Sequence, residues 1–245
     1  MKMHKTLIAA LVSAALTAPA LADDHTLDNG GDRYDKDGDW DYVSEVSAAQ
    51  AYLDMKTNEA VVIDVRTLRE YAAGHPERAY NVPYPRIDGW KNGMLKQDPG
   101  VFYWEVFNIV HGKTDTPIYT LCRTGSRSVN AADILASPED YGIDGPAFEN
   151  VRNIWEGFVG QPKYAYAGGD IAEPHVKLDL NGNGVADQDT ADVYDHTTDM
   201  NPDKDGWRNF QNLPWTTKVL PPHAYQSNWR QYACWQTDEG CPSPF

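Results

Sequence analysis

The 245-residue chain has little positive charge and few cysteines, and its one pronounced apolar run lies at the amino terminus. Its 21 lysines and arginines stand against 36 aspartates and glutamates, a net charge of −15. Such a chain repels a phosphate backbone, which disfavours nucleic acid as a partner. Beyond the amino terminus no run is apolar enough to span a bilayer, so we expect no membrane span in the mature protein.

The amino terminus, residues 1–22, has the pattern of a secretory signal peptide. Lys2 and Lys5 precede a short apolar run, and Ala20-Leu21-Ala22 offers a cleavage site. A membrane anchor is the alternative, but the run is short for a span. We therefore predict an exported protein, periplasmic in a Gram-negative bacterium and otherwise secreted.

The chain holds three cysteines. Cys234 and Cys241 are close enough in sequence to close a small loop, and we expect them to form a disulfide in an oxidising compartment. This pairing leaves Cys122 as the odd thiol. A redox-active pair is the alternative, although the spacing is wider than that of the usual CxxC.

The sequence around Cys122 predicts a strand, a tight turn and a helix. A β-favouring run, residues 117–121, ends at the thiol, and residues 128–136 carry apolar side chains at the helical repeat. The turn between them, CRTGSR, opens a helix and can direct backbone N–H groups inward toward an anion. With Arg123 and Arg127 it favours the thiolate, so we predict an exposed nucleophile. The alternative, a small buried core residue, fits such a polar turn poorly.

Strand-like and helical segments alternate along the middle of the chain. We predict strands over residues 60–65, 79–82, 117–121 and 150–155, helices over 43–55, 68–73, 101–110 and 128–136, and a loop over 84–100. This alternation indicates an α/β fold with a mainly parallel sheet covered by helices. Ligand sites in such sheets lie beyond the carboxyl ends of the strands, which is where Cys122 is placed.

Several separated motifs resemble the rhodanese family of sulfurtransferases. Residues 62–84 are similar to the family's first signature, in which a strand ending DVR leads to a GH turn and an AxNxP strand. Residues 122–128 resemble its active loop, and residues 153–158 the strand before its closing helix. Residues 206–215 resemble the closing segment, where a tryptophan begins a helix and an LP pair ends it. The resemblance implies a rhodanese-like α/β domain over residues 43–218, after an acidic linker over residues 23–42.

The resemblance also implies a reaction. Cys122 would take sulfane sulfur from a small anionic donor such as thiosulfate, carry it as a persulfide, and pass it to cyanide or a thiol, including a thiol protein. The substrate-binding loop would be Arg123, Thr124, Gly125, Ser126 and Arg127, with Arg127 closing the loop. Four residues separate Cys122 from Arg127, as in the sulfurtransferase branch, which disfavours phosphate-ester hydrolysis. We expect no cofactor to be required for catalysis. The loop supplies the electrostatics by itself, so no separate general base is demanded.

Three charged residues match structural positions of the family. Asp64, Arg66 and Glu70 are expected to tie the first strand to its neighbouring helix through charged hydrogen bonds. His75, in the GH turn, is expected to be structural rather than a general acid or base.

The chain departs from the family pattern in an acidic insert over residues 159–205. Oxygen-bearing side chains alternate there before a glycine, a spacing that suits Ca²⁺. The candidate ligands are Asp179, Asn181, Asn183 and Asp187, with a weaker set at Asn201, Asp203 and Asp205. Both loops lack the last glutamate of an EF-hand, so we predict weak, structural Ca²⁺ binding; the alternative is an ion-free surface segment. Residues 219–245 form a C-terminal extension with the Cys234–Cys241 disulfide.

Two other functions stay open at this point. The protein could be a non-enzymatic persulfide carrier or sensor that hands sulfur only to a dedicated protein. It could also be a calcium-dependent interaction module on a rhodanese fold, in which case its binding survives Cys122→Ser.

Overall fold

The computed structural model describes residues 40–57, 60–89, 93–161, 164–166, 175–177, 205–209 and 213–228. Several sequence predictions therefore lie outside the described residues. They are the signal peptide, most of the linker, the Cys234–Cys241 disulfide and the candidate calcium ligands Asp179, Asn181, Asn183, Asp187, Asn201 and Asp203.

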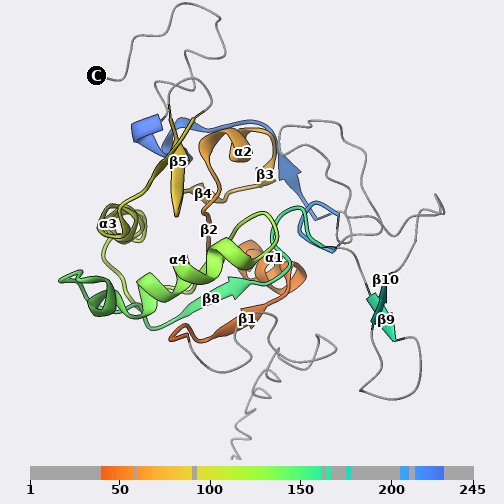
Figure 1. Ribbon diagram of the computed structural model, residues 1–245, viewed down its shortest axis with the longest axis horizontal. Coiled ribbons are helices and arrows are strands. Elements are labelled where there is room, and N and C mark those ends of the chain that lie inside the picture. Colours follow the sequence, from red (N-terminus) through yellow and green to blue (C-terminus); the bar gives the residue numbers. More distant parts are fainter. Residues whose placement is uncertain are drawn as a thin grey trace, which may run out of the picture.

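A five-stranded sheet with the order β1-β8-β7-β2-β4 forms the centre of the fold, and every neighbouring pair in it is parallel (Figure 1). In this order the strands are Ser44–Val46, Val151–Ile154, Ile118–Leu121, Val61–Asp64 and Tyr80–Asn81. Central strands of a parallel sheet are covered on both faces, which is why β2 and β7 are mostly apolar runs in the sequence. The structure confirms the predicted α/β fold with a mainly parallel sheet.

Helices cover both faces of the sheet and divide the core into two clusters. The helices are α1 (Ala48–Thr57), α2 (Leu68–Ala72), α3 (Pro99–Ile109) and α4 (Ser126–Ala136), with 3₁₀ turns at Pro138–Tyr141 and Pro221–His223. Side chains of α3 and α4 pack with Ile63 and Ile118 in one cluster. Side chains of α1 and α2 pack with Val62 and Tyr119 in the other. Successive strand residues therefore face opposite clusters, as the pleat requires.

Two predicted segments differ from the structure. The helix predicted over residues 43–55 begins only at Ala48, after the edge strand β1, and Ser47 accepts a hydrogen bond from the Gln50 N–H at 3.1 Å. The loop predicted over residues 84–100 contains a hairpin of β5 (Arg86–Asp88) and β6 (Met94–Lys96). Strands of three residues are too short to show a period, and the side chains of β6 are exposed.

The remaining strands form two further small antiparallel sheets. β9 (Tyr164–Tyr166) pairs with β10 (His175–Lys177) inside the predicted insert, and β3 (His75–Pro76) pairs with β11 (Trp215–Thr216). Where the resemblance implies a helix beginning at a tryptophan, Trp207 lies in a turn over residues 207–209. Its buried indole N–H donates to the Pro214 carbonyl at 2.8 Å, which ties this turn to the strand that follows. Within the described ranges, no helix has the length and apolar character that a membrane span needs.

Candidate active site

Cys122 directly follows β7, at the carboxyl end of a central strand. Its Sγ accepts hydrogen bonds from the backbone N–H groups of Gly125, at 3.2 Å, and Arg127, at 3.3 Å. Gly125 precedes α4 with a φ of 96°, a left-handed conformation that favours glycine and bends the chain back over the sulfur. Two N–H groups at the start of a helix thus face the sulfur and stabilise a negative charge on it.

The prediction of an exposed thiol is wrong, because Cys122 is 0% exposed. The residue belongs to the core cluster that contains side chains of α3 and α4. The backbone of the following loop contacts its sulfur. Four of the other loop residues are more accessible: Arg123, Thr124 and Arg127 are half-buried, and Ser126 is exposed, whereas Gly125 is buried.

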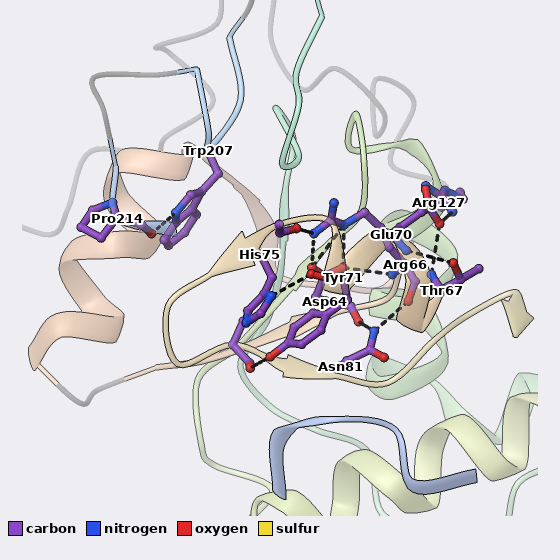
Figure 2. A network of polar contacts seen from close by, with 12 residues as sticks. Asp64, Arg66, Thr67, Glu70, Tyr71, His75, Asn81, Arg127, Trp207 and Pro214 are labelled. Carbon is purple, nitrogen blue, oxygen red and sulfur yellow. Dashed lines mark hydrogen bonds and ion pairs between the residues drawn. The ribbon is translucent and has the colours of Figure 1, made fainter. Parts of the chain in front are cut away.

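Arg127 forms a two-pronged ion pair with Glu70 of α2 (Figure 2). Its Nη1 and Nη2 donate to the two carboxylate oxygens at 2.9 and 2.7 Å. Burial by itself raises the pKa of Glu70, but the hydrogen bonds and charge of Arg127 outweigh it and hold that pKa below its usual value. Glu70 was expected to tie the first strand to its helix; it instead joins α2 to the active loop.

Glu70 is fixed by its own helix as well. Thr67 is the N-cap of α2, and Glu70 is the third residue of the helix, so the two form a capping box. The Thr67 N–H donates to Glu70 Oε2 at 3.1 Å, and the Glu70 N–H donates to Thr67 Oγ1 at 3.3 Å. The carboxylate therefore meets Arg127 in a defined orientation.

Asp64 and Arg66 form a buried ion pair at the end of β2 (Figure 2). Arg66 Nε donates to Asp64 Oδ1 at 2.9 Å, and its Nη2 also donates to the Gly74 carbonyl at 2.7 Å. Asn81 of β4 donates its side-chain N–H to the carbonyls of Asp64 and Arg66, at 3.0 and 2.7 Å. The network joins β2, β4 and the turn after α2, and the charge of Arg66 helps to lower the pKa of Glu70.

His75 packs against the same network. Its Nδ1–H donates to the Tyr71 carbonyl at 2.7 Å, and its ring stacks on the Tyr71 ring with centroids 3.5 Å apart. The Tyr71 hydroxyl in turn donates to the Ala79 carbonyl at 2.8 Å. Burial lowers the pKa of His75 to about 4, so the imidazole is neutral near pH 7.

Because His75 is buried and neutral, we predict that the wild type loses stability in mild acid. In His75→Asn this loss should be absent. Unfolding frees the ring to protonate with its ordinary pKa of 6.5, so the stability is complete above that pH and falls as the pH drops toward 4. We expect the free energy of unfolding of the wild type to be about 2 kcal/mol lower at pH 5 than at pH 7.5 on account of this group. The asparagine amide can keep the hydrogen bond to Tyr71 but does not titrate. Urea titrations of both proteins at both pH values measure the difference, and an equal pH dependence contradicts the prediction.

Three polar residues behind the active loop escaped the sequence analysis. Ser128 Oγ donates to the Gly125 carbonyl at 2.8 Å and lies 2.6 Å from Asn153 Oδ1 on β8. The Asn153 amide donates to Glu45 Oε1 on β1 at 2.7 Å. All three are buried, and Asn153, a polar residue on a strand that begins with Val151 and ends with Ile154, was the signal that could have identified them.

Asp205 is the one candidate calcium ligand that the structure describes. It is buried, and its Oδ1 accepts a hydrogen bond from the Gln161 N–H at 2.7 Å. Among the described residues, no group of three or more His, Cys, Asp and Glu side chains could hold a metal ion. Ca²⁺ binding stays a prediction for the insert.

The chain is similar to one family model and to a curated relative. The family model of the rhodanese-like domain matches residues 47–160. An uncharacterised protein of Rickettsia prowazekii (strain Madrid E) is 30% identical over 122 residues, which cover 48% of this chain and 85% of that protein.

Two solved structures are also similar to the chain. The solution NMR structure of the rhodanese-like domain of an Anabaena protein shares 16% identity with a TM-score of 0.32, over 46% of this chain and 68% of that one. The crystal structure of an M. tuberculosis protein shares 22% identity with a TM-score of 0.35, over 50% of this chain and 84% of that one. The family match spans the Cys122 loop and every strand of the parallel sheet except β1, and the chain belongs to the rhodanese-like domain family.

Proposed function

We propose that the protein is a sulfurtransferase that moves sulfane sulfur from thiosulfate, or a similar small anion, to a thiophilic acceptor through Cys122. The observation that carries the proposal is the pair of backbone N–H groups that meet Sγ, at 3.2 and 3.3 Å, at the start of α4. Donors fixed around a sulfur stabilise the charge of a thiolate nucleophile without any reorganisation during the reaction.

The transfer has two steps. The Cys122 thiolate attacks the outer sulfur of thiosulfate, a new S–S bond forms, and the S–S bond of the donor breaks so that sulfite leaves with the electron pair. Cyanide then attacks the outer sulfur of the Cys122 persulfide, the C–S bond of thiocyanate forms, and the electron pair of the broken S–S bond returns to the Cys122 sulfur. Each step balances without a proton or an external oxidant, because one bond to the transferred sulfur forms as one breaks.

The charges around the loop support an anionic donor. Arg127 lies at the loop with its guanidinium on Glu70, and burial, which by itself lowers the arginine pKa, is outweighed by the carboxylate, which raises it. Arg127 therefore stays charged, and Arg123 adds a second positive charge to a chain that is otherwise strongly acidic. A local positive field in an acidic protein concentrates small anions at this loop.

Intact mass measured before and after thiosulfate, and again after cyanide, tests the proposal. We expect the reduced protein to gain one sulfur atom and to lose it as thiocyanate forms. A folded, reduced sample that gains no sulfur from thiosulfate or from other sulfane donors contradicts it.

A persulfide carrier is the second candidate, and the full burial of Cys122 favours it. A buried persulfide is shielded from small molecules and would be released only when a partner protein opens the loop. Turnover separates the two: repeated thiocyanate formation indicates an enzyme, whereas loading without turnover indicates a carrier. Export, the C-terminal disulfide and structural Ca²⁺ in the insert belong to the same proposal.

A further inference from the structure

Two short segments lie at the two ends of the predicted insert, and we call them together the clasp: residues 157–161 and residues 205–209. The Trp207 N–H donates to the Gly157 carbonyl and the Arg208 N–H to the Phe158 carbonyl, both at 2.8 Å. The Asp205 N–H donates to the Gln161 carbonyl at 2.9 Å, and Asp205 Oδ1 accepts from the Gln161 N–H. Asn209 adds a bond from its amide to the Val159 carbonyl at 2.7 Å. Backbone bonds thus run along the whole length of the clasp.

Glycines let the two segments approach closely. A Cβ atom on Gly160 would lie 1.9 Å from the Asp205 carbonyl oxygen, and one on Gly206 would lie 2.4 Å from the Gly160 nitrogen. Both residues have positive φ angles, 85° and 93°. No other residue fits either position, so the contact is built into the backbone.

The first segment of the clasp holds the beginning of the active loop. The Phe158 N–H donates to the Cys122 carbonyl at 2.8 Å, and the N–H groups of Val159 and Gly160 donate to the Arg123 carbonyl at 2.9 and 3.2 Å. In a trans peptide the carbonyl and the following N–H point in opposite directions. Fixing these two carbonyls on the clasp therefore turns the N–H groups of Arg123 and Thr124 to the opposite side of the loop.

Gly157 touches the loop backbone itself. A Cβ atom at this position would lie 2.6 Å from both the carbonyl carbon of Arg123 and the nitrogen of Thr124. Backbone atoms cannot rotate away as the end of a side chain can, so an added methyl group must push the loop.

From these contacts we propose that Gly157 and the clasp are positioning elements for the nucleophile. They hold the Cys122–Thr124 backbone in the position in which the Gly125 and Arg127 N–H groups can donate to the sulfur. The inference deepens the proposed function, on which it rests for its consequence in sulfur transfer. It also gives Asp205 a role other than metal ligation, because the second segment of the clasp holds the first, which contacts the active loop.

The decisive comparison is Gly157→Ala against Gly142→Ala. Both glycines have nearly the same φ, 70° and 71°, so both variants carry the same backbone strain, but a Cβ at Gly142 meets nothing within 4 Å. The measurement is the rate at which iodoacetamide alkylates Cys122 as a function of pH, with the modified peptide followed by mass spectrometry. We expect the midpoint of the Gly157→Ala profile to lie about one pH unit higher than that of Gly142→Ala, because the weakened N–H contacts stabilise the thiolate less.

Sulfur transfer from thiosulfate to cyanide should fall about tenfold in Gly157→Ala and stay unchanged in Gly142→Ala. Identical pH profiles in the two variants overturn the inference, provided that both give the near-ultraviolet circular dichroism of the folded protein. The alkylation profile needs no sulfur donor, so it tests the clasp even if the wild type transfers no sulfur, an outcome that contradicts the proposed function alone.

A second pair of variants decides the matter if Gly157→Ala does not fold. Asp205→Ala removes the acceptor of the Gln161 N–H, whereas Asp205→Asn keeps an oxygen in the same place. We expect Asp205→Ala to shift the alkylation profile to higher pH and Asp205→Asn to restore it. A profile of Asp205→Ala that equals that of the wild type overturns the inference.

Discussion

Cys122→Ser is expected to take up no sulfur from thiosulfate and to form thiocyanate at least about 10³-fold more slowly than the wild type. A serine hydroxyl keeps its proton at neutral pH, and an oxygen in this place cannot become a persulfide. The two N–H groups that meet the sulfur would still be present, so the variant loses the nucleophile and keeps the loop that surrounds it. Intact mass and a colorimetric thiocyanate assay measure the two effects.

The matched control replaces the other two cysteines together. Cys234→Ser/Cys241→Ser should gain one sulfur atom as the wild type does, because neither residue belongs to the active loop. Cys122→Ser should also unfold at nearly the same temperature as the wild type, since the exchange is almost isosteric. Sulfur uptake that survives in Cys122→Ser and disappears in the double variant would place the chemistry at the carboxyl end of the chain.

Arg127→Ala is expected to slow sulfur transfer about 100-fold and to lower the free energy of unfolding by about 2 to 3 kcal/mol. The guanidinium donates hydrogen bonds to both carboxylate oxygens of Glu70, a residue that is 6% exposed. Removing it takes a positive charge from the anion site and leaves a buried negative charge beside it. That charge then repels both thiosulfate and the Cys122 thiolate. Urea unfolding and steady-state kinetics at several thiosulfate concentrations measure the two losses.

The double variant Arg127→Ala/Glu70→Gln separates stability from catalysis. Glutamine removes the unpaired charge, and its amide oxygen can still accept the Thr67 N–H of the capping box. We expect the double variant to recover most of the lost stability and only a small part of the transfer rate, because the positive charge is still missing. A full recovery of the rate would mean that Arg127 acts only by neutralising Glu70.

Two central strands were predictable because their apolar character is nearly continuous. β2 and β7 are covered on both faces and leave mostly apolar runs, whereas β8 carries Arg152 and Asn153 between its apolar ends. β1 and the β5–β6 hairpin left no such signal: β1 is a three-residue edge strand, and the residues of β6 are exposed. Four of the five strands of the parallel sheet, including the edge strand β4, were therefore predicted from the sequence, whereas β1, the hairpin and the strand order were visible only in the structure.

The same contrast holds for the site. The loop from Cys122 to Arg127 was predictable because its N–H groups and its sulfur belong to neighbouring residues. The partner of Glu70 was not, because Arg127 is 57 residues away and Arg66 lies much nearer in sequence. Asp205 shows a further limit, since oxygen-bearing side chains before a glycine suit either a cation or a turn held by hydrogen bonds.

Two hydrogen bonds join Gln161 and Asp205, and they affect which insertions and deletions the domain can tolerate. The two residues lie side by side whatever stands between them, so an insertion or deletion at this point alters neither end of the domain. The entropy of closing a flexible loop grows only logarithmically, by about 0.6 kcal/mol for each doubling of its length. Lengthening, shortening or exchange of the intervening sequence therefore costs little free energy of folding. New segments can be inserted at this position with little effect on the stability of the domain.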